Sequence, residues 1–182
     1  MDGKLPLLSI LLPAHNRADV IGFAIKSVLA QEVGDFELLV VGDGCTDNTA
    51  EVVNSFNDDR IRWFDFPKGP GYGYANRNVA LRQARGKYIG FMAHDDIVFH
   101  DHYRLCIEAI EIDDRLEIAF TRPLWITREG EIIPVEFNLN NSQTLEPFLE
   151  CRRNAMPATC VVHRQSCFTK YGYWDDSFSF KD

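Results

Sequence analysis

The sequence lacks the positive charge that marks many polymer-binding proteins. It has 19 lysines and arginines against 27 aspartates and glutamates, which gives a formal net charge of −8. We expect no binding to a nucleic-acid polymer, because affinity for such polymers comes mainly from Lys and Arg contacts with phosphates. A small phosphorylated ligand remains compatible with this charge, since a bound divalent cation can supply the positive charge.

Cysteine is scarce, and no apolar run is long. The five cysteines are odd in number and form no CxxC pair, which favours reduced thiols in a cytoplasmic protein over a disulfide framework. Cys151, Cys160, His163 and Cys167 lie close in sequence, but their spacing fits no common zinc finger. The longest N-terminal apolar stretch, 5–12, is too short to cross a bilayer, so we expect no integral membrane segment.

Two common nucleotide-binding motifs are also missing. No GxxxxGK(S/T) pattern occurs, which excludes a P-loop. The first expected strand-to-helix turn contains no glycine, which excludes the dinucleotide fingerprint. The glycines at 69, 71 and 73 follow the third expected strand and have the wrong spacing for either motif.

The first two thirds of the chain alternate between expected strands and helices. Apolar runs predict strands at 5–12, 36–41, 61–66 and 88–93. Helical spacing of apolar residues predicts helices between them, with Asn16 as the cap of the first helix and Gly86 as the end of the third. This pattern is typical of an α/β fold in which helices cover both faces of a parallel sheet.

The regular alternation of expected strands and helices ends after residue 121. A hairpin is expected over 124–135, then a strand at 158–162 and a short helix at 165–171. We interpret residues 1–121 as a ligand-binding α/β half and residues 122–182 as the start of a second region of the same domain.

Polar side chains follow three of the expected strands. They are the segment 13–17, then Asp43, and then the segment 94–96. Ligands of open α/β sheets bind beyond the carboxyl ends of the strands, where these residues would meet. Carboxylates that approach one another repel unless a cation or a hydrogen-bond donor lies between them. The sequence therefore predicts a ligand site at this edge.

Several blocks extend this pattern along almost the whole chain. In order they read LLPAHNR at 11–17, VGDGCTD at 41–47, NRN at 76–78, ARGKYI at 84–89, HDD at 94–96 and GYWDDSFSFKD at 172–182. Together they resemble the GT-A-fold, family 2 inverting glycosyltransferases. The resemblance implies a Rossmann-like, mostly parallel sheet flanked by helices, with a smaller mixed β region in the last third. It also implies metal-dependent sugar transfer from a nucleotide-diphosphate sugar, with a UDP-sugar favoured, to an acceptor hydroxyl with inversion.

The resemblance implies how the donor nucleotide is held. Asp43 would accept the imide N–H of a uracil or thymine ring, and Pro13, His15 and Asn16 would form the other wall of the base pocket. Arg77 would contact the phosphates or the base of the donor. On general grounds, an Asp after a strand is often a turn residue, and an Asn there often caps a helix.

The resemblance also assigns metal binding and catalysis to the acidic blocks. By the same resemblance, Asp96 is the ligand of Mn²⁺ or Mg²⁺, while Asp95 faces the ribose or the water shell of the metal. Ala93 stands where the family often has another Asp, which is a departure from the pattern. An acidic pair at a helix start is the structural alternative. Asp182 is the expected general base, which takes the proton of the acceptor hydroxyl.

The resemblance also implies partners. These are a nucleotide-sugar donor and a saccharide or lipid-linked acceptor, with Tyr72, Tyr74 and Trp174 as candidates for a sugar pocket. Many members build cell-surface polysaccharides, which would place the full-length protein peripherally at the inner membrane face. Because Asp182 is the last residue and the family continues with helices that hold the acceptor, we expect a C-terminally truncated fragment that binds the donor with weak or no transfer.

Two other functions remain open at this point. A nucleotidyltransferase shares a related sheet and metal-bound carboxylates, but it normally has a Gly-rich, basic loop after the first strand, which this sequence lacks. A non-catalytic nucleotide- or carbohydrate-binding module would bind its ligand without a metal and without Asp96.

Overall fold

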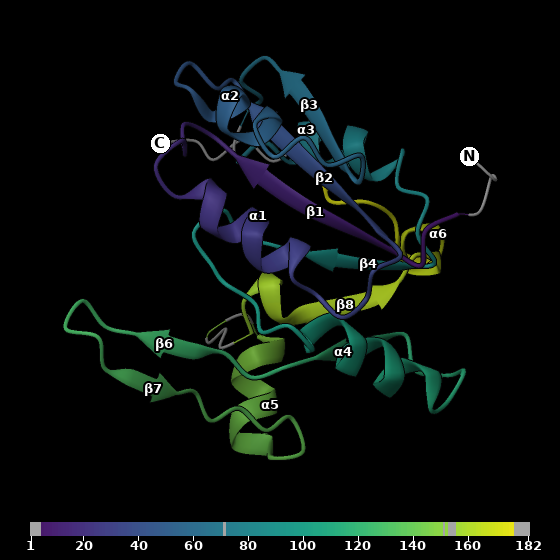
Figure 1. Cartoon of the computed structure of the whole chain (residues 1–182). Coiled ribbons are helices and arrows are strands. Elements are labelled where there is room, and N and C mark those ends of the chain that lie inside the picture. Colours follow the sequence, from purple (N-terminus) through teal and green to yellow (C-terminus); the bar gives the residue numbers. More distant parts are fainter. Residues whose placement is uncertain (1–4, 71, 151, 153–155, 177–182) are drawn as a thin grey trace.

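The computed structural model describes residues 5–70, 72–150, 152 and 156–176, in which strands and helices alternate (Figure 1). The strands are β1 (Leu8–Ala14), β2 (Phe36–Asp43), β3 (Ile61–Phe66), β4 (Tyr88–Phe91), β5 (Ile118–Phe120), β6 (Leu124–Ile126), β7 (Ile132–Pro134) and β8 (Val161–Arg164). The helices are α1 (Ile21–Leu29), α2 (Thr49–Asn54), α3 (Tyr74–Leu81), α4 (His102–Glu111), α5 (Ser142–Leu149) and α6 (Ser166–Tyr171), with a 3₁₀ turn, η1, at Ala158–Cys160.

One sheet organises the molecule. Its strand order is β3-β2-β1-β4-β8-β5, and β6 and β7 form a separate two-stranded hairpin. The first four strands in this order are parallel, whereas β8 runs antiparallel to both of its neighbours. The expectation of an α/β fold, with a mostly parallel sheet and a smaller mixed β region in the last third, is confirmed.

The core lies on both faces of the sheet because alternate residues of a strand point to opposite faces. In β1, Leu8, Ile10 and Leu12 join a cluster with α1 and α4, whereas Leu11 joins a second cluster with α3 and α6. Of the helix stripe at 21, 24, 25, 28 and 29 predicted from the sequence, the first four residues are buried in the first cluster, and Leu29 packs against it partly buried. Helices therefore cover both faces, as the alternation of apolar runs indicates.

Some local predictions are wrong. Asn16 does not cap α1, which begins only at Ile21 and has Val20 at its cap without a side-chain hydrogen bond. Gly86 does not end α3, which stops at Leu81. Gly86 is required for another reason: a Cβ at this position would lie 2.4 Å from the backbone nitrogen of Ser9 in β1.

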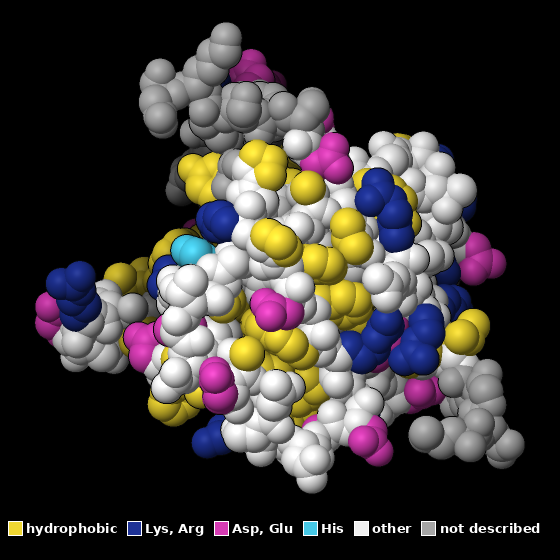
Figure 2. Space-filling model, turned by 90° about the horizontal axis from the view of Figure 1, so that it is seen from above, with side chains coloured by type: hydrophobic (Ala, Val, Ile, Leu, Met, Phe, Trp, Pro, Cys, Tyr) yellow, Lys and Arg dark blue, Asp and Glu magenta, His cyan; other side chains and the backbone are white. Residues whose placement is uncertain are grey.

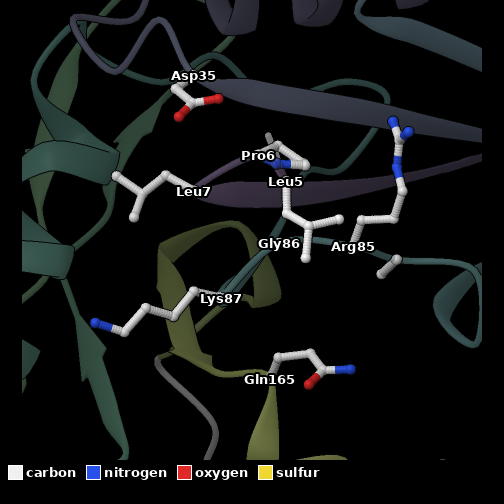
Figure 3. A pocket seen from close by; sticks show the side chains of 9 residues that line it. Leu5, Pro6, Leu7, Asp35, Arg85, Gly86, Lys87 and Gln165 are labelled. Atoms are coloured by element: carbon white, nitrogen blue, oxygen red, sulfur yellow. The ribbon is translucent and has the colours of Figure 1, made fainter. Parts of the chain in front are cut away.

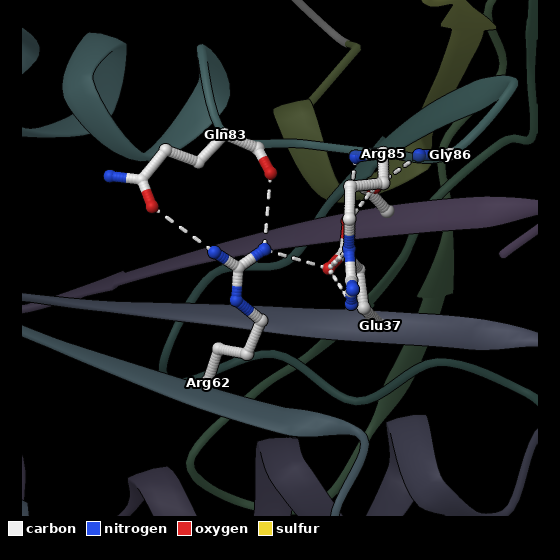
Figure 4. A network of polar contacts seen from close by, with 6 residues as sticks. Glu37, Arg62, Gln83, Arg85 and Gly86 are labelled. Carbon is white, nitrogen blue, oxygen red and sulfur yellow. Dashed lines mark hydrogen bonds and ion pairs between the residues drawn. The ribbon is translucent and has the colours of Figure 1, made fainter. Parts of the chain in front are cut away.

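A buried carboxylate ties β2 to β3 and to the segment before β4 (Figure 4). Glu37 is only 2% exposed. It accepts hydrogen bonds from the Ser9 hydroxyl (2.7 Å), from the Arg62 guanidinium (2.8 Å) and from the Arg85 backbone N–H (2.7 Å) and guanidinium (2.7 and 2.9 Å). The Ser9 hydroxyl in turn accepts from the Gly86 N–H at 2.9 Å. An ionised carboxylate can be buried here because each oxygen has charged or polar donors.

The sheet edge at β3 is less completely covered than its centre. Residues of β3 are half-buried apart from the exposed Asp65, whereas every residue of β2 is buried. Figure 2 looks onto the molecule from the side of α2 and β3, and it shows hydrophobic atoms gathered in the middle of the face with Lys and Arg atoms beside them. None of the helices in the described ranges has the length and apolar character needed to cross a bilayer.

Candidate functional site

A cleft of about 430 Å³ opens at the carboxyl ends of the parallel strands. Five of the six residues expected to bind the nucleotide line it: Pro13, His15, Asn16, Asp43 and Arg77. In Figure 1 the arrowheads of β1 and β4 point the same way, so their carboxyl ends lie at one end of the sheet. The volume of the cleft is in the range of small-molecule sites, about 300–1,000 Å³.

The remaining expected site residues are Asp95, Asp96 and Asp182. His94 and Ala93 belong to the lining of the cleft, and Asp95 and Asp96 follow them directly along the chain. Asp182 lies outside the described residues.

Asp43 is the most strongly held group in the cleft. Its side chain is 9% exposed and accepts from the Lys68 ammonium (2.7 Å), the Gly69 N–H (2.7 Å) and the Asn76 amide (2.6 Å). Burial raises the pKa of this carboxyl, but these donors outweigh burial and hold its pKa below the ordinary range. Asp43 is therefore an anion at neutral pH, fixed in the cleft by the loop that follows β3.

This loop needs a glycine where it passes Asp43. Gly73 has φ +72° and precedes α3. A Cβ on Gly73 would lie 2.7 Å from Oδ2 of Asp43, so only a residue without a side chain fits against the carboxylate. Lys68 was not singled out in the sequence, and Asn76 was quoted only as part of the NRN block, because nothing in the local pattern shows that either side chain reaches Asp43.

The loop after β1 is tied to the loop after β2. The His15 ring nitrogen Nδ1 lies 2.8 Å from the Asp43 carbonyl oxygen. Asn16 has φ +52°, and its Oδ1 accepts from the Thr46 N–H at 2.7 Å and the Asp47 N–H at 3.3 Å. Asn16 thus joins two loops instead of capping a helix, and this fixes one wall of the cleft.

Arg77 brings a cation into the cleft. Its guanidinium lies 5.1 Å from the centre of the Tyr74 ring, and among the described residues it has no hydrogen bond or ion pair. Burial lowers the pKa of Arg77, while Tyr74 and Asp43 act in the opposite direction. A guanidinium remains charged in proteins, so its N–H donors are available to an anionic ligand.

The segment after β4 forms a turn at the mouth of the cleft. The Asp96 N–H donates to the Ala93 carbonyl at 3.4 Å. The Arg17 guanidinium donates to Nε2 of His94 at 2.6 Å, and the same nitrogen lies 3.7 Å from the exposed carboxylate of Asp95. Asp95 and Asp96 directly follow Ala93 and His94, which line the cleft.

Aromatic residues form part of the cleft lining. Trp174 lines it, with ring centres 5.8 Å from Tyr74 and 5.5 Å from Phe91. The Asn78 amide donates to the Trp174 carbonyl at 2.8 Å and holds this segment against α3. Of the aromatic candidates for a sugar pocket, Tyr72 and Trp174 line the cleft, and Tyr74 packs behind Trp174.

A larger hollow, of about 770 Å³, lies at the other end of the strands (Figure 3). Its cationic side chains are already paired: Arg85 with Glu37, and Lys87 with Glu111 at 2.6 Å. This hollow therefore offers no available cation to a ligand. In the described part of the chain, no three His, Cys, Asp or Glu side chains form a metal-holding group, and Cys151 of the zinc interpretation lies outside that part.

Comparison with known families shows to which family the chain belongs. A family model described as glycosyl transferase family 2 matches residues 9–169. The chain belongs to glycosyltransferase family 2. The resemblance stated from the sequence blocks is thus confirmed, and the cleft of this family 2 chain lies between the blocks that carried it.

Individual relatives are longer than this family 2 chain. The chondroitin synthase of Pasteurella multocida strain Pm70 is 32% identical over 168 residues, which are 91% of this chain and 16% of the synthase. Residues 1–349 of S. aureus TarS, solved with UDP, superpose with a TM-score of 0.73 at 21% identity, covering 95% of this chain and 51% of that TarS fragment. The mannosyltransferase PcManGT from Pyrobaculum calidifontis, solved with GDP-Man and Mn²⁺, gives 0.66 at 14% identity, covering 96% and 49%. These superpositions show the GT-A fold.

Proposed function

We propose that this chain is the donor-binding part of an inverting glycosyltransferase that uses a UDP-sugar. The observation that carries the proposal is that one cleft is lined both by a fixed anion, Asp43, and by an available cation, Arg77. A nucleoside diphosphate needs both an acceptor for its base N–H and donors for its phosphates. TarS, which has the same fold, was solved with UDP, and this supports uracil as the base.

Each side of the cleft has a part in binding. Asp43 accepts the imide N–H of the base, while Pro13, His15 and Asn16 form the wall against which the base lies. Arg77 donates to phosphate oxygens, for which its planar fork is suited. In this proposal residues 1–121 bind the donor, and residues 122–182 begin the acceptor side of the same domain.

A divalent cation belongs to this proposal. Asp95 and Asp96 carry hard oxygen donors directly after residues that line the cleft, and such donors suit Mn²⁺ or Mg²⁺. We assign Asp96 as the protein ligand and Asp95 to the ribose or the water shell. When bound, the cation would neutralise the diphosphate and stabilise its departure as a Lewis acid. The Mn²⁺ in PcManGT supports the choice of ion.

Transfer itself is a single displacement. The acceptor oxygen attacks the anomeric carbon, the bond from that carbon to the diphosphate oxygen breaks, and the electron pair leaves with the diphosphate. A carboxylate receives the hydroxyl proton, and we assign this role to Asp182; positioned general bases contribute about 10²–10⁴-fold. The named synthase relative supports a saccharide acceptor and a role in polysaccharide synthesis.

Calorimetric titration with UDP, dTDP, GDP and ADP, each with Mn²⁺ and with EDTA, tests the proposal. We expect UDP to bind, and to bind more tightly with Mn²⁺. Binding of a different diphosphate would reassign the base, and equal binding with EDTA would refute the metal.

The Asp43→Ala variant should lose affinity for UDP by about 1.5–3 kcal/mol, the contribution of a hydrogen bond to a charged group. Ribose 5-diphosphate, which has no base, should bind the variant and the unchanged chain alike. The measurement is calorimetry with both ligands, with Asp65→Ala on the exposed part of β3 as the control. An equal loss for both ligands would show that Asp43 does not read the base.

Arg77→Gln should weaken UDP and ribose 5-diphosphate equally, by about 1.5–3 kcal/mol, because both lose a charged donor to phosphate. Uridine should bind as before. Arg82→Gln is the control, since Arg82 lies on the same side of the sheet but its guanidinium packs on the Tyr173 ring, 4.7 Å from the ring centre. A loss confined to UDP would instead place Arg77 at the base.

A further inference from the structure

One buried hydroxyl group from the last third of the chain connects both ends of the turn that holds Asp96. Thr159 lies in η1, directly before β8, and is only 6% exposed. Its Oγ1 accepts from the Ala93 N–H at 3.0 Å and donates to Oδ2 of Asp96 at 2.5 Å. The residue is far from the turn in sequence, and it reaches the turn because β8 pairs with β4.

The two hydrogen bonds act on the Asp96 carboxylate in a defined way. Because Thr159 donates to Oδ2, it fixes the rotation of the carboxylate and leaves Oδ1 without a partner among the described residues. The bond from Ala93 fixes the hydroxyl oxygen, so its proton is directed at Asp96. A carboxylate held in this way loses little conformational freedom when it binds a cation.

We propose that Thr159 is a positioning residue, which orients the Asp96 carboxylate toward a divalent cation bound with the donor diphosphate. This inference rests on the proposed role of Asp96. It adds that the region after residue 121 completes the metal-binding turn of the first region.

The test compares Thr159→Val, which keeps the shape but cannot donate, with Thr159→Ser, which restores the hydroxyl. The affinity for UDP is measured by calorimetry with Mn²⁺ and with EDTA. We expect Thr159→Val to weaken UDP by about 10–100-fold with Mn²⁺, the usual cost of losing a group that orients a metal ligand. UDP affinity in EDTA should stay unchanged, and Thr159→Ser should restore the affinity with Mn²⁺.

A matched control is Thr121→Val. The Thr121 hydroxyl lies 3.1 Å from the His102 ring nitrogen, in the same part of the molecule, and has no hydrogen bond to Asp96 among the described residues. This variant should bind UDP with Mn²⁺ as the unchanged chain does. Thr159→Ala serves as a second variant without a hydroxyl if Thr159→Val does not fold.

The outcomes separate this inference from the proposed function. Unchanged affinity in the variants without the hydroxyl, or an equal loss with Mn²⁺ and with EDTA, would overturn the positioning role while the metal site stands. No metal dependence in the unchanged chain would overturn the metal site and this inference with it. A loss confined to Mn²⁺, with rescue by serine, supports both.

Discussion

Asp96→Asn is expected to remove the metal-dependent part of UDP binding. In Mn²⁺ the affinity for UDP should fall by about 100-fold or more, since loss of a ligand should cost at least the upper end of what loss of its supporting partner costs. In EDTA the variant and the unchanged chain should bind UDP alike. Calorimetric titration in the two buffers measures both affinities.

Asn keeps the shape of the side chain and can still accept from the Thr159 hydroxyl, so the turn after β4 should persist. Thermal unfolding should therefore change little. Asp65→Asn, an exposed carboxylate on β3, controls for the loss of one negative charge. Unchanged affinity of Asp96→Asn for UDP in manganese buffer would contradict the assignment of Asp96 as the metal ligand.

Glu37→Ala is expected to have the largest effect on stability. The change leaves Arg62 and Arg85 without their buried carboxylate partner and the Ser9 hydroxyl without its acceptor (Figure 4). Removing one partner of a buried pair costs about 3–5 kcal/mol, and the partial exposure of the two guanidinium groups places the expected loss at about 3 kcal/mol. Urea unfolding measures this loss.

The effect of Glu37 should depend on pH. Burial raises the pKa of its carboxyl, but the donors, Arg85 foremost, outweigh burial, so its pKa lies below the usual 4.5. A lowered pKa in the folded state means that the stabilisation is fully present above pH 4.5 and is lost as the pH falls through the lowered value. The stability difference between Glu37→Ala and the unchanged chain should shrink over that range.

The control for Glu37 is Glu108→Ala. Glu108 pairs with Arg104 on the exposed side of α4, and such surface pairs contribute about 0–1 kcal/mol. A loss for Glu37→Ala as small as this would mean that the network is not needed for the fold.

Sequence patterns predict the strands and helices whose positions are set by their own residues. The strand at 61–66 and both strands of the hairpin lie where their apolar runs place them, and Gly130 turns between them with φ +84°. Helix α5 was missed because Pro147 interrupts its pattern and it buries no residue. The expected strand at 158–162 begins instead with a 3₁₀ turn.

The cleft was predictable where its residues lie at or just beyond the carboxyl ends of strands. Asp43 and the segment 13–17 meet there because parallel strands bring their carboxyl ends to one edge. Lys68 and Thr159 were not predictable, since their partners are far away in sequence and no periodic pattern marks them. The resemblance to a family indicated what each candidate residue does. The side chains that hold those residues in position come from distant segments, which only the packing of the fold brings together.

The antiparallel strand β8 has a consequence for the order of folding. The chain leaves the sheet after β5 and returns between β4 and β5 only after a long excursion, so β4 has no neighbour on one side until residues 161–164 have been synthesised. A pairing over such a separation forms slowly, because loop closure precedes the contacts that stabilise it. During that interval β4 is an exposed edge, which is open to pairing with another chain.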